Sequence, residues 1–185
     1  MKINVSAGHN PDGKVACGAV GLIKESTEAR KVTNEVIRLL KENGHTVYKC
    51  TCSNGTSQSN VLAKIVAKCN SHKVDLDISI HFNAGASDKK GNGKTTGTEV
   101  LVYSAKSKAK PYAEKVAKSI SELGFKNRGV KVRDNLYFLH RTNSPAMLIE
   151  CCFVDDKDDV KLYNYKEMAT AIVDGILGYR IILNV

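Results

Sequence analysis

The chain has 185 residues, of which 42% are hydrophobic and 25% are charged, as is ordinary for one soluble domain with a substantial core. No stretch approaches the roughly 18 to 20 consecutive apolar residues of a membrane span, which excludes membrane insertion. The segment Met1 to Val5 reaches a glycine turn too early for a signal peptide. We therefore expect synthesis in the cytoplasm without an export signal.

Lysine and arginine outnumber aspartate and glutamate by 28 to 19, which gives a net charge of +9. This charge favours an anionic partner such as a wall polymer, a nucleic acid or a membrane surface, although solubility alone explains it equally well. The sequence has no recognition motif with interleaved aromatic residues. We therefore expect no nucleic-acid partner.

Six cysteines are spread along the chain, and four of them lie in or beside apolar strand or helix patterns. They are Cys17, Cys50, Cys52, Cys69, Cys151 and Cys152. Their spacing lacks the two-residue gap of a zinc knuckle, which argues against a thiolate metal site. We expect free thiols, in keeping with folding in a reducing cytoplasm.

The apolar pattern alternates between strand and helix periods along the chain. A strand at Lys2–Ser6 is followed by a glycine-rich loop from Gly8 to Gly21. The later elements are a helix through Val32, Val36, Leu39 and Leu40 that stops at Gly44, a strand at His45–Cys50, a helix at Ser57–Ser71, strands at Leu76–His81 and Thr98–Tyr103, a helix at Ala109–Leu123, strands at Leu136–Leu139 and Met147–Phe153, and a helix at Tyr165–Leu177.

Strands that alternate with helices of this length predict a single α/β domain. We expect an open, largely parallel but mixed, twisted sheet of about six strands that is covered by helices on both faces. The segment from Ala84 to Gly97 is rich in glycine and polar residues and lacks apolar periodicity, so it is predicted to be a mobile loop beside the cleft.

Ligands of such sheets bind beyond the carboxyl ends of the strands, where His9, His81 and Glu150 are all expected. Two imidazoles and one carboxylate with an open fourth position form a catalytic zinc site. Glu25 and Glu28, at a helix start, are equally placed to supply that carboxylate, and both are also explained by a favourable helix dipole.

Glu150 lies between two apolar triplets, where an unpaired charge is costly to bury. It is either a general base beside the metal or half of a buried salt bridge to Arg133 or Arg141. His140 and Arg141 precede the predicted strand that carries Glu150, so we expect them to border the cleft.

Several segments, in their order along the chain, together resemble the zinc-dependent N-acetylmuramoyl-L-alanine amidases, especially the catalytic domains of clostridial phage endolysins. They are Gly8-His9, Lys24 to Arg30, Ser79-Ile80-His81-Phe82-Asn83-Ala84, Gly97-Thr98-Glu99-Val100, Lys126 to Lys131, and Leu148-Ile149-Glu150. The resemblance implies that His9, Glu25 and His81 bind Zn²⁺ and that Glu150 is the catalytic carboxylate. It selects Glu25 over Glu28 by its distance from Gly44.

This resemblance implies hydrolysis of the amide between N-acetylmuramic acid and L-alanine in bacterial peptidoglycan. We expect Asn83, His140 and Arg141 to be substrate contacts. The enzyme would act on the wall after release, through a holin if it is phage-encoded. Residues 1–178 would be the catalytic domain, and 179–185 a tail or the start of a linker to a wall-binding domain. Two alternatives remain open at this point: a zinc peptidase that cuts within the stem peptide, and a basic wall-binding module without activity.

Overall fold

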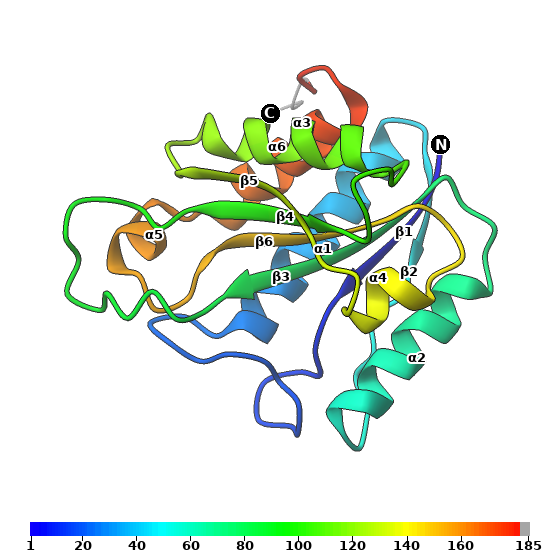
Figure 1. The fold of residues 1–185 in the computed structure, drawn as a ribbon, viewed down its shortest axis with the longest axis horizontal. Coiled ribbons are helices and arrows are strands. Elements are labelled where there is room, and N and C mark those ends of the chain that lie inside the picture. The colour runs from blue at the N-terminus through cyan, green and yellow to red at the C-terminus, as the bar shows by residue number, and fades with distance from the viewer. Residues whose placement is uncertain (182–185) are drawn as a thin grey trace.

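The computed structural model describes residues 1–181 and contains one six-stranded sheet (Figure 1). The strands are β1 (Lys2–Ala7), β2 (Thr46–Lys49), β3 (Leu76–Asn83), β4 (Thr98–Val102), β5 (Asn127–Val132) and β6 (Ala146–Phe153). Their order across the sheet is β2-β1-β3-β6-β4-β5, and all neighbours are parallel except the antiparallel pair β4 and β6. The predicted α/β class with a mixed, largely parallel sheet is confirmed.

Helices cover both faces of this sheet (Figure 1). They are α1 (Glu25–Glu42), α2 (Gln58–Asn70), α3 (Lys110–Ser121), α4 (Tyr137–Arg141), α5 (Lys157–Leu162) and α6 (Tyr165–Leu177). Helices α1, α3 and α6 pack on one face and enclose the larger core, whereas α2 and α4 enclose a smaller core on the opposite face. No helix of residues 1–181 has both the length and the apolar character needed to cross a membrane.

Strand β3 explains how the sheet exposes different chemistry on its two faces. Ile78, Ile80 and Phe82 alternate along the strand and pack into the larger core. Because successive side chains point to opposite faces, Ser79 and His81 lie on the face of the smaller core. The same strand therefore supplies both buried packing and the polar side chains of its carboxyl end.

Helix α1 follows the pattern that the sequence predicts. Its buried positions, including Val32, Val36 and Leu40, recur at helical spacing and pack against the sheet. Gly44 follows the helix with a φ of 78°, a left-handed conformation that glycine adopts without steric cost. The helix therefore ends where the sequence predicts, and its first residue is Glu25.

One predicted element is wrong, and two elements of the structure were not predicted. The predicted strand Leu136–Leu139 is wrong, because helix α4 forms there and buries the adjacent residues Phe138 and Leu139 against the smaller core. Strand β5 was not predicted because it is an edge strand without a buried residue, and its apolar residues are limited to Val130 and Val132. Helix α5 was missed because it has only six residues and depends on the side chain of Asp156, which accepts hydrogen bonds from two backbone N–H groups at its start.

The loop from Ala84 to Gly97 is held in place by more contacts than its composition predicts. Four aspartates at the start of α5 accept hydrogen bonds from its backbone: Asp155 from residues 85 to 87, Asp158 from residues 92 and 93, Asp156 from residue 96 and Asp159 from residue 97. The structure therefore gives this loop defined anchoring points, and its mobility stays a prediction. Polar contacts anchor it in place of apolar packing.

Candidate active site

Three elements bring His9, Glu25 and His81 together at one end of the sheet. His9 follows β1, Glu25 is the first residue of α1, and His81 lies near the carboxyl end of β3. Strands β1 and β3 are parallel neighbours in register, so their carboxyl ends lie side by side. Two of these side chains therefore meet because of strand pairing, and the third because α1 begins at the same edge.

The three side chains converge on one carboxylate oxygen. Oε1 of Glu25 lies 3.1 Å from Nε2 of His9 and 3.0 Å from Nδ1 of His81. Each of the three residues offers one ligand atom, a nitrogen or an oxygen, and these three atoms all lie within 4.8 Å of one another. Two imidazole nitrogens and a carboxylate oxygen at this separation can hold a metal ion, and the set is typical of catalytic zinc sites.

Two glycines leave the room that these side chains occupy. A Cβ atom at Gly8 would lie 1.9 Å from the ring of His81, and one at Gly18 would lie 2.5 Å from the carboxylate of Glu25. Gly18 also has a φ of 79°, which disfavours any other residue. Both positions therefore require glycine if the cluster is to form.

Hydrogen bonds to groups outside the cluster hold the side chains of Glu25 and His81 and the backbone at His9. Oε2 of Glu25 accepts from the backbone N–H of Ala19 at 2.7 Å, and Nε2 of His81 lies 3.1 Å from the Ser79 hydroxyl. Arg30, one turn further along α1, donates to the backbone oxygen of His9 at 2.8 Å. Such supporting contacts orient metal ligands and set which imidazole nitrogen faces the metal.

The electrostatics of the cluster suit metal ligation. Burial lowers the pKa of His81 despite the neighbouring Glu25 carboxylate, so its imidazole is neutral at physiological pH. Burial alone would raise the pKa of Glu25, but hydrogen bonds from His81 and His9 outweigh it and hold that pKa well below its usual range. The set thus offers a neutral imidazole and an ionised carboxylate.

Glu150 lies next to this cluster through strand register. On β6 it pairs with His81 of β3 on one side and with Glu99 of β4 on the other. Directly opposed side chains on one face have Cβ atoms roughly 4.5 to 5.5 Å apart. Glu150 is therefore a neighbour of a candidate ligand, as the sequence predicted.

The carboxylate of Glu150 is partly buried and incompletely paired. Its Oε2 atom is inaccessible to solvent and has no hydrogen-bond partner within residues 1–181. Neither Arg133 nor Arg141 forms an ion pair with it in that part of the chain, so the structure lacks the salt bridge that was the alternative reading. Burial, with the negative charges of Glu25 and Glu99, raises the pKa of Glu150 to about 8.

Glu99 shows the contrast between a paired carboxylate and Glu150. Its Oε2 atom lies 3.0 Å from Nε of Arg128, and its Oε1 atom accepts from the side-chain amide of Asn83 at 3.2 Å. The guanidinium of Arg128 also lies over the ring of Phe153, 5.1 Å from its centroid. Of the two adjacent carboxylates, only Glu150 retains an oxygen free for chemistry.

The remaining predicted residues lie at different distances from the cluster. Asn83 lies two residues beyond His81, at the same end of β3. Glu28 instead pairs with Lys31 at 2.8 Å and accepts from the Tyr163 hydroxyl at 3.1 Å. The acidic residue that the structure brings to the histidines is thus Glu25.

His140 and Arg141 lie on α4 rather than beside the ligand cluster. The ring of His140 stacks on that of Tyr103, with 5.6 Å between centroids. Tyr103 directly follows Val102, which pairs with Met147, three residues before Glu150. At about 3.3 Å per residue, Met147 lies roughly 10 Å along the strand from Glu150, so a substrate contact by His140 or Arg141 stays a prediction.

Sequence reasoning missed the groups that support the cluster. Ser79 was detectable, because it lies two residues before His81 on a strand and therefore on the same face. The backbone N–H of Ala19 and the space at Gly18 gave no such signal, because both depend on how the loop before α1 folds back onto Glu25.

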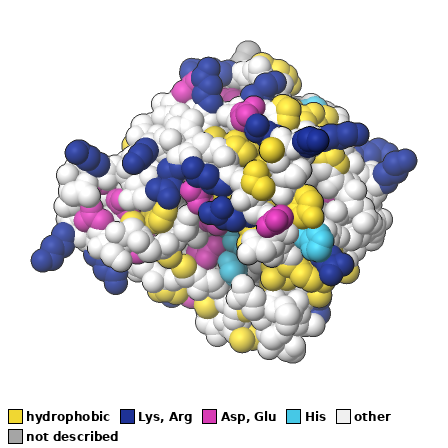
Figure 2. Space-filling model, in the orientation of Figure 1, with side chains coloured by type: hydrophobic (Ala, Val, Ile, Leu, Met, Phe, Trp, Pro, Cys, Tyr) yellow, Lys and Arg dark blue, Asp and Glu magenta, His cyan; other side chains and the backbone are white. Residues whose placement is uncertain are grey.

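Figure 2 shows the molecular surface in the orientation of Figure 1, where histidine, acidic and basic side chains gather near the centre of the view.

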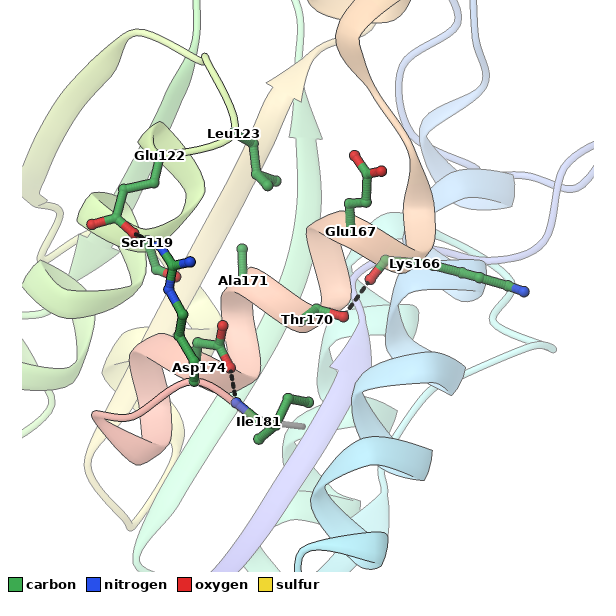
Figure 3. A pocket seen from close by; sticks show the side chains of 10 residues that line it. Ser119, Glu122, Leu123, Lys166, Glu167, Thr170, Ala171, Asp174 and Ile181 are labelled. Atoms are coloured by element: carbon green, nitrogen blue, oxygen red, sulfur yellow. Dashed lines mark hydrogen bonds and ion pairs between the residues drawn. The ribbon is translucent and has the colours of Figure 1, made fainter. Parts of the chain in front are cut away.

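A separate cavity of about 370 Å³ lies between α3 and α6. Its lining includes Leu123, Ala171 and Asp174, and none of the predicted site residues (Figure 3). The candidate active site is therefore placed by the cluster of His9, Glu25 and His81, and not by this cavity.

Comparison with known proteins identifies the family. The sequence profile of the N-acetylmuramoyl-L-alanine amidases matches residues 3–178, which is nearly the whole chain. The chain belongs to this amidase family. The predicted resemblance is thereby confirmed, and with it an amidase-type enzyme related to cell-wall hydrolases.

The relatives of this amidase domain include longer proteins. An uncharacterized 38.4 kDa protein of Clostridium perfringens is 42% identical over 168 residues, which cover 90% of this chain and 47% of the relative. The endolysin of Bacillus phage SPP1 is 29% identical over 92% of this chain and 61% of its own length. The chain thus spans about half the length of the first of these relatives.

Solved structures share the amidase fold. The catalytic domain of the CD27L endolysin targeting Clostridia difficile superposes with a TM-score of 0.86 at 29% identity, and the match covers 98% of this chain and 99% of that domain. The amidase AmiC2 of Nostoc punctiforme has a TM-score of 0.78 at 23% identity over 96% of both chains, a likeness of fold alone. The six-stranded architecture is therefore that of the family.

Proposed function

We propose that this chain hydrolyses the amide bond between N-acetylmuramic acid and the L-alanine of the peptidoglycan stem peptide. One zinc ion would be held by His9, Glu25 and His81, with Glu150 as the catalytic carboxylate. The observation that carries the proposal is the unpaired, solvent-inaccessible oxygen of Glu150 beside a two-imidazole, one-carboxylate set. Membership of the amidase family supports the choice of bond.

The residues present fit a catalytic zinc site. The three side chains already converge, glycines at positions 8 and 18 leave them room, and Ser79 can hold His81 with Nδ1 turned toward Glu25. Zinc, when bound there, supplies the positive charge that lowers the pKa of water to about 7 and polarises the amide carbonyl. Three protein ligands leave a fourth position for water and substrate.

Glu150 performs the proton transfers in this proposal. Its carboxylate takes a proton from the attacking water as the new C–O bond forms at the lactyl carbonyl. It then delivers that proton to the alanine nitrogen as the C–N bond breaks, which releases a free amine and a muramic carboxylate. Glu99 cannot replace it, because Arg128 and Asn83 occupy both of its oxygens.

The substitution Glu150→Gln tests the proposed role, because it keeps the shape of the side chain and removes its basicity. We expect zinc content and fold to be unchanged and activity on purified walls to fall at least ~100-fold, the usual scale for a general acid or base. Wall lysis at the parent rate would make Glu150 a structural residue.

Mass analysis of the wall fragments tests the bond that is cut. Amidase action gives stem peptides with a free alanine amine and glycans without peptide. New amino termini within the stem peptide would indicate a peptidase instead.

We further propose that the chain acts as the catalytic part of an endolysin, on the wall and outside the compartment where it is made. The likeness to the SPP1 endolysin and to the CD27L catalytic domain supports this role. The net charge of +9 favours adsorption to an anionic wall. Expression with and without a holin, followed by measurement of lysis, tests whether release is required.

A further inference from the structure

A groove of about 490 Å³ opens between the loop before α1 and the loop after β3. Its lining consists of Val20, Ala84, Ser87, Asp88, Lys89, Lys90 and Asp155. Ala84 lies three residues beyond His81, and Val20 follows Ala19, whose backbone N–H donates to Glu25. Two of the segments that line the groove therefore continue directly from residues of the candidate zinc site.

The walls of this groove are fixed rather than free. Asp155 accepts hydrogen bonds from the backbone N–H groups of Gly85, Ala86 and Ser87, at 2.9 to 3.2 Å. On the facing wall, the backbone N–H of Leu22 donates to the oxygen of Val154 at 2.7 Å. Residues 154 and 155 thus hold both walls, and the groove exists without a ligand.

The charges that line the groove favour an anion. Lys89 and Lys90 are exposed, and neither forms an ion pair within residues 1–181. Three N–H groups surround the carboxylate of Asp155. Oδ1 of Asp88 accepts from the N–H of Gly91 at 2.9 Å, whereas its Oδ2 is buried and has no hydrogen-bond partner within residues 1–181. The solvent-exposed side chains that the lining presents to a ligand include the two ammonium groups and the apolar side chain of Val20, whereas the unpaired oxygen of Asp88 is buried.

We propose that this groove binds the acidic stem peptide, with Lys89 and Lys90 contacting its carboxylates; this inference rests on the proposed amidase function. A peptide suits the groove better than a glycan, because the lining has no aromatic ring on which a sugar can stack. The acetylated glycan is also neutral once its lactyl groups are in amide linkage, whereas the peptide carries free carboxylates. The two lysines are therefore specificity residues that act on substrate binding.

The test compares two small substrates in the parent and in the double variant Lys89→Glu/Lys90→Glu. N-acetylmuramyl-L-alanyl-D-glutamate carries the carboxylates, and N-acetylmuramyl-L-alanine amide carries none. We expect the double variant to raise KM for the acidic substrate about tenfold, with little change in kcat, and to leave KM for the neutral substrate unchanged. Equal KM values for parent and variant on the acidic substrate would overturn the proposal.

The matched control is Lys94→Glu/Lys106→Glu, which changes the net charge equally at exposed positions outside the groove. A similar rise in KM in this control would assign the effect to net charge and overturn the inference. If the parent releases no amine from either substrate, the proposed function fails. Calorimetry of L-alanyl-D-glutamate binding to the parent and both double variants then tests peptide binding by the groove independently of activity. Weaker binding only in Lys89→Glu/Lys90→Glu supports the proposal, and equal binding in all three proteins rejects it.

Discussion

At the scale of single residues, the structure distinguishes two acidic side chains in the first turn of α1 as candidate ligands. Glu25 and Glu28 both lie in the first turn of α1, but only Glu25 points its carboxylate at the two histidines. Glu28 is occupied by Lys31 and Tyr163. Residues three apart lie on one side of a helix. Glu25 nevertheless meets the histidines at the edge of the sheet, whereas Glu28 meets Tyr163, which directly follows α5.

This difference predicts the outcome of removing each carboxylate. We expect Glu25→Ala to abolish tight zinc binding, because it removes one of three ligands, and Glu28→Ala to leave one zinc per chain. Metal analysis after dialysis measures both, with unchanged circular dichroism as the check on folding. Zinc loss only in Glu28→Ala would move the ligand to that position.

Glu150 also predicts a pH dependence of stability in the metal-free protein. Its folded-state pKa of about 8 exceeds the unfolded value of about 4.3, so the folded state binds more protons between these values. The free energy of unfolding therefore decreases as the pH rises from ~4 to ~8, and above pH ~8 the full cost of burying the ionised carboxylate is present.

We expect Glu150→Gln to be more stable than the parent at pH 9 in the presence of a chelator, by on the order of 2 kcal/mol, and equally stable at pH 4. Urea unfolding across this pH range measures the difference. Identical unfolding midpoints at pH 9 would show that the buried carboxylate finds a partner in solution.

At the scale of elements, the loop from 84 to 97 depends on the aspartates that precede and begin α5. Burial alone would raise the pKa of Asp155, but the backbone N–H groups of Ser87, Gly85 and Ala86 outweigh it and lower that pKa. Asp158 holds a different part of the loop, the N–H groups of Asn92 and Gly93. Each carboxylate thus orders its own segment.

We therefore expect Asp155→Asn to speed amide exchange at residues 85 to 87 and to cost about 1 kcal/mol of stability, because a neutral amide is a weaker acceptor. Asp158→Asn is the matched control, and it should speed exchange only at residues 92 and 93. Hydrogen exchange read by NMR distinguishes the two patterns. Uniform exchange along the loop in the parent would contradict this anchoring.

At the scale of the whole molecule, metal binding should couple to global stability. The candidate ligands come from the end of β1, the start of α1 and the end of β3, so the complete site exists only in the folded state. A metal at 100 times its Kd stabilises the folded state by about 2.7 kcal/mol. For a chain of this size, that corresponds to roughly 5 to 10 °C in Tm.

We expect a chelator to lower the Tm of the zinc-loaded parent by this amount and to leave Glu25→Ala unaffected. Differential scanning calorimetry measures both. A Tm that does not respond to zinc or chelator in the parent would remove the metal from the proposal.

The sequence by itself determined the class of fold and the residues of the candidate site. Apolar periodicity located the central strands and the long helices, because buried elements must repeat their apolar residues at the period of the backbone. His9, His81 and Glu150 were identifiable because each lies at or near the end of an apolar strand, where parallel strands present their ligands. Their motifs together pointed to the amidase family.

Only the tertiary structure decided which groups touch. Strand β5 and helix α4 lack a periodic signal, since the first is an exposed edge and the second is a single turn packed on α2. The anchored loop, the free oxygen of Glu150 and the groove beside Lys89 all depend on side chains from distant segments. Such contacts leave no local pattern, because hydrogen bonds between distant segments impose no period on either one.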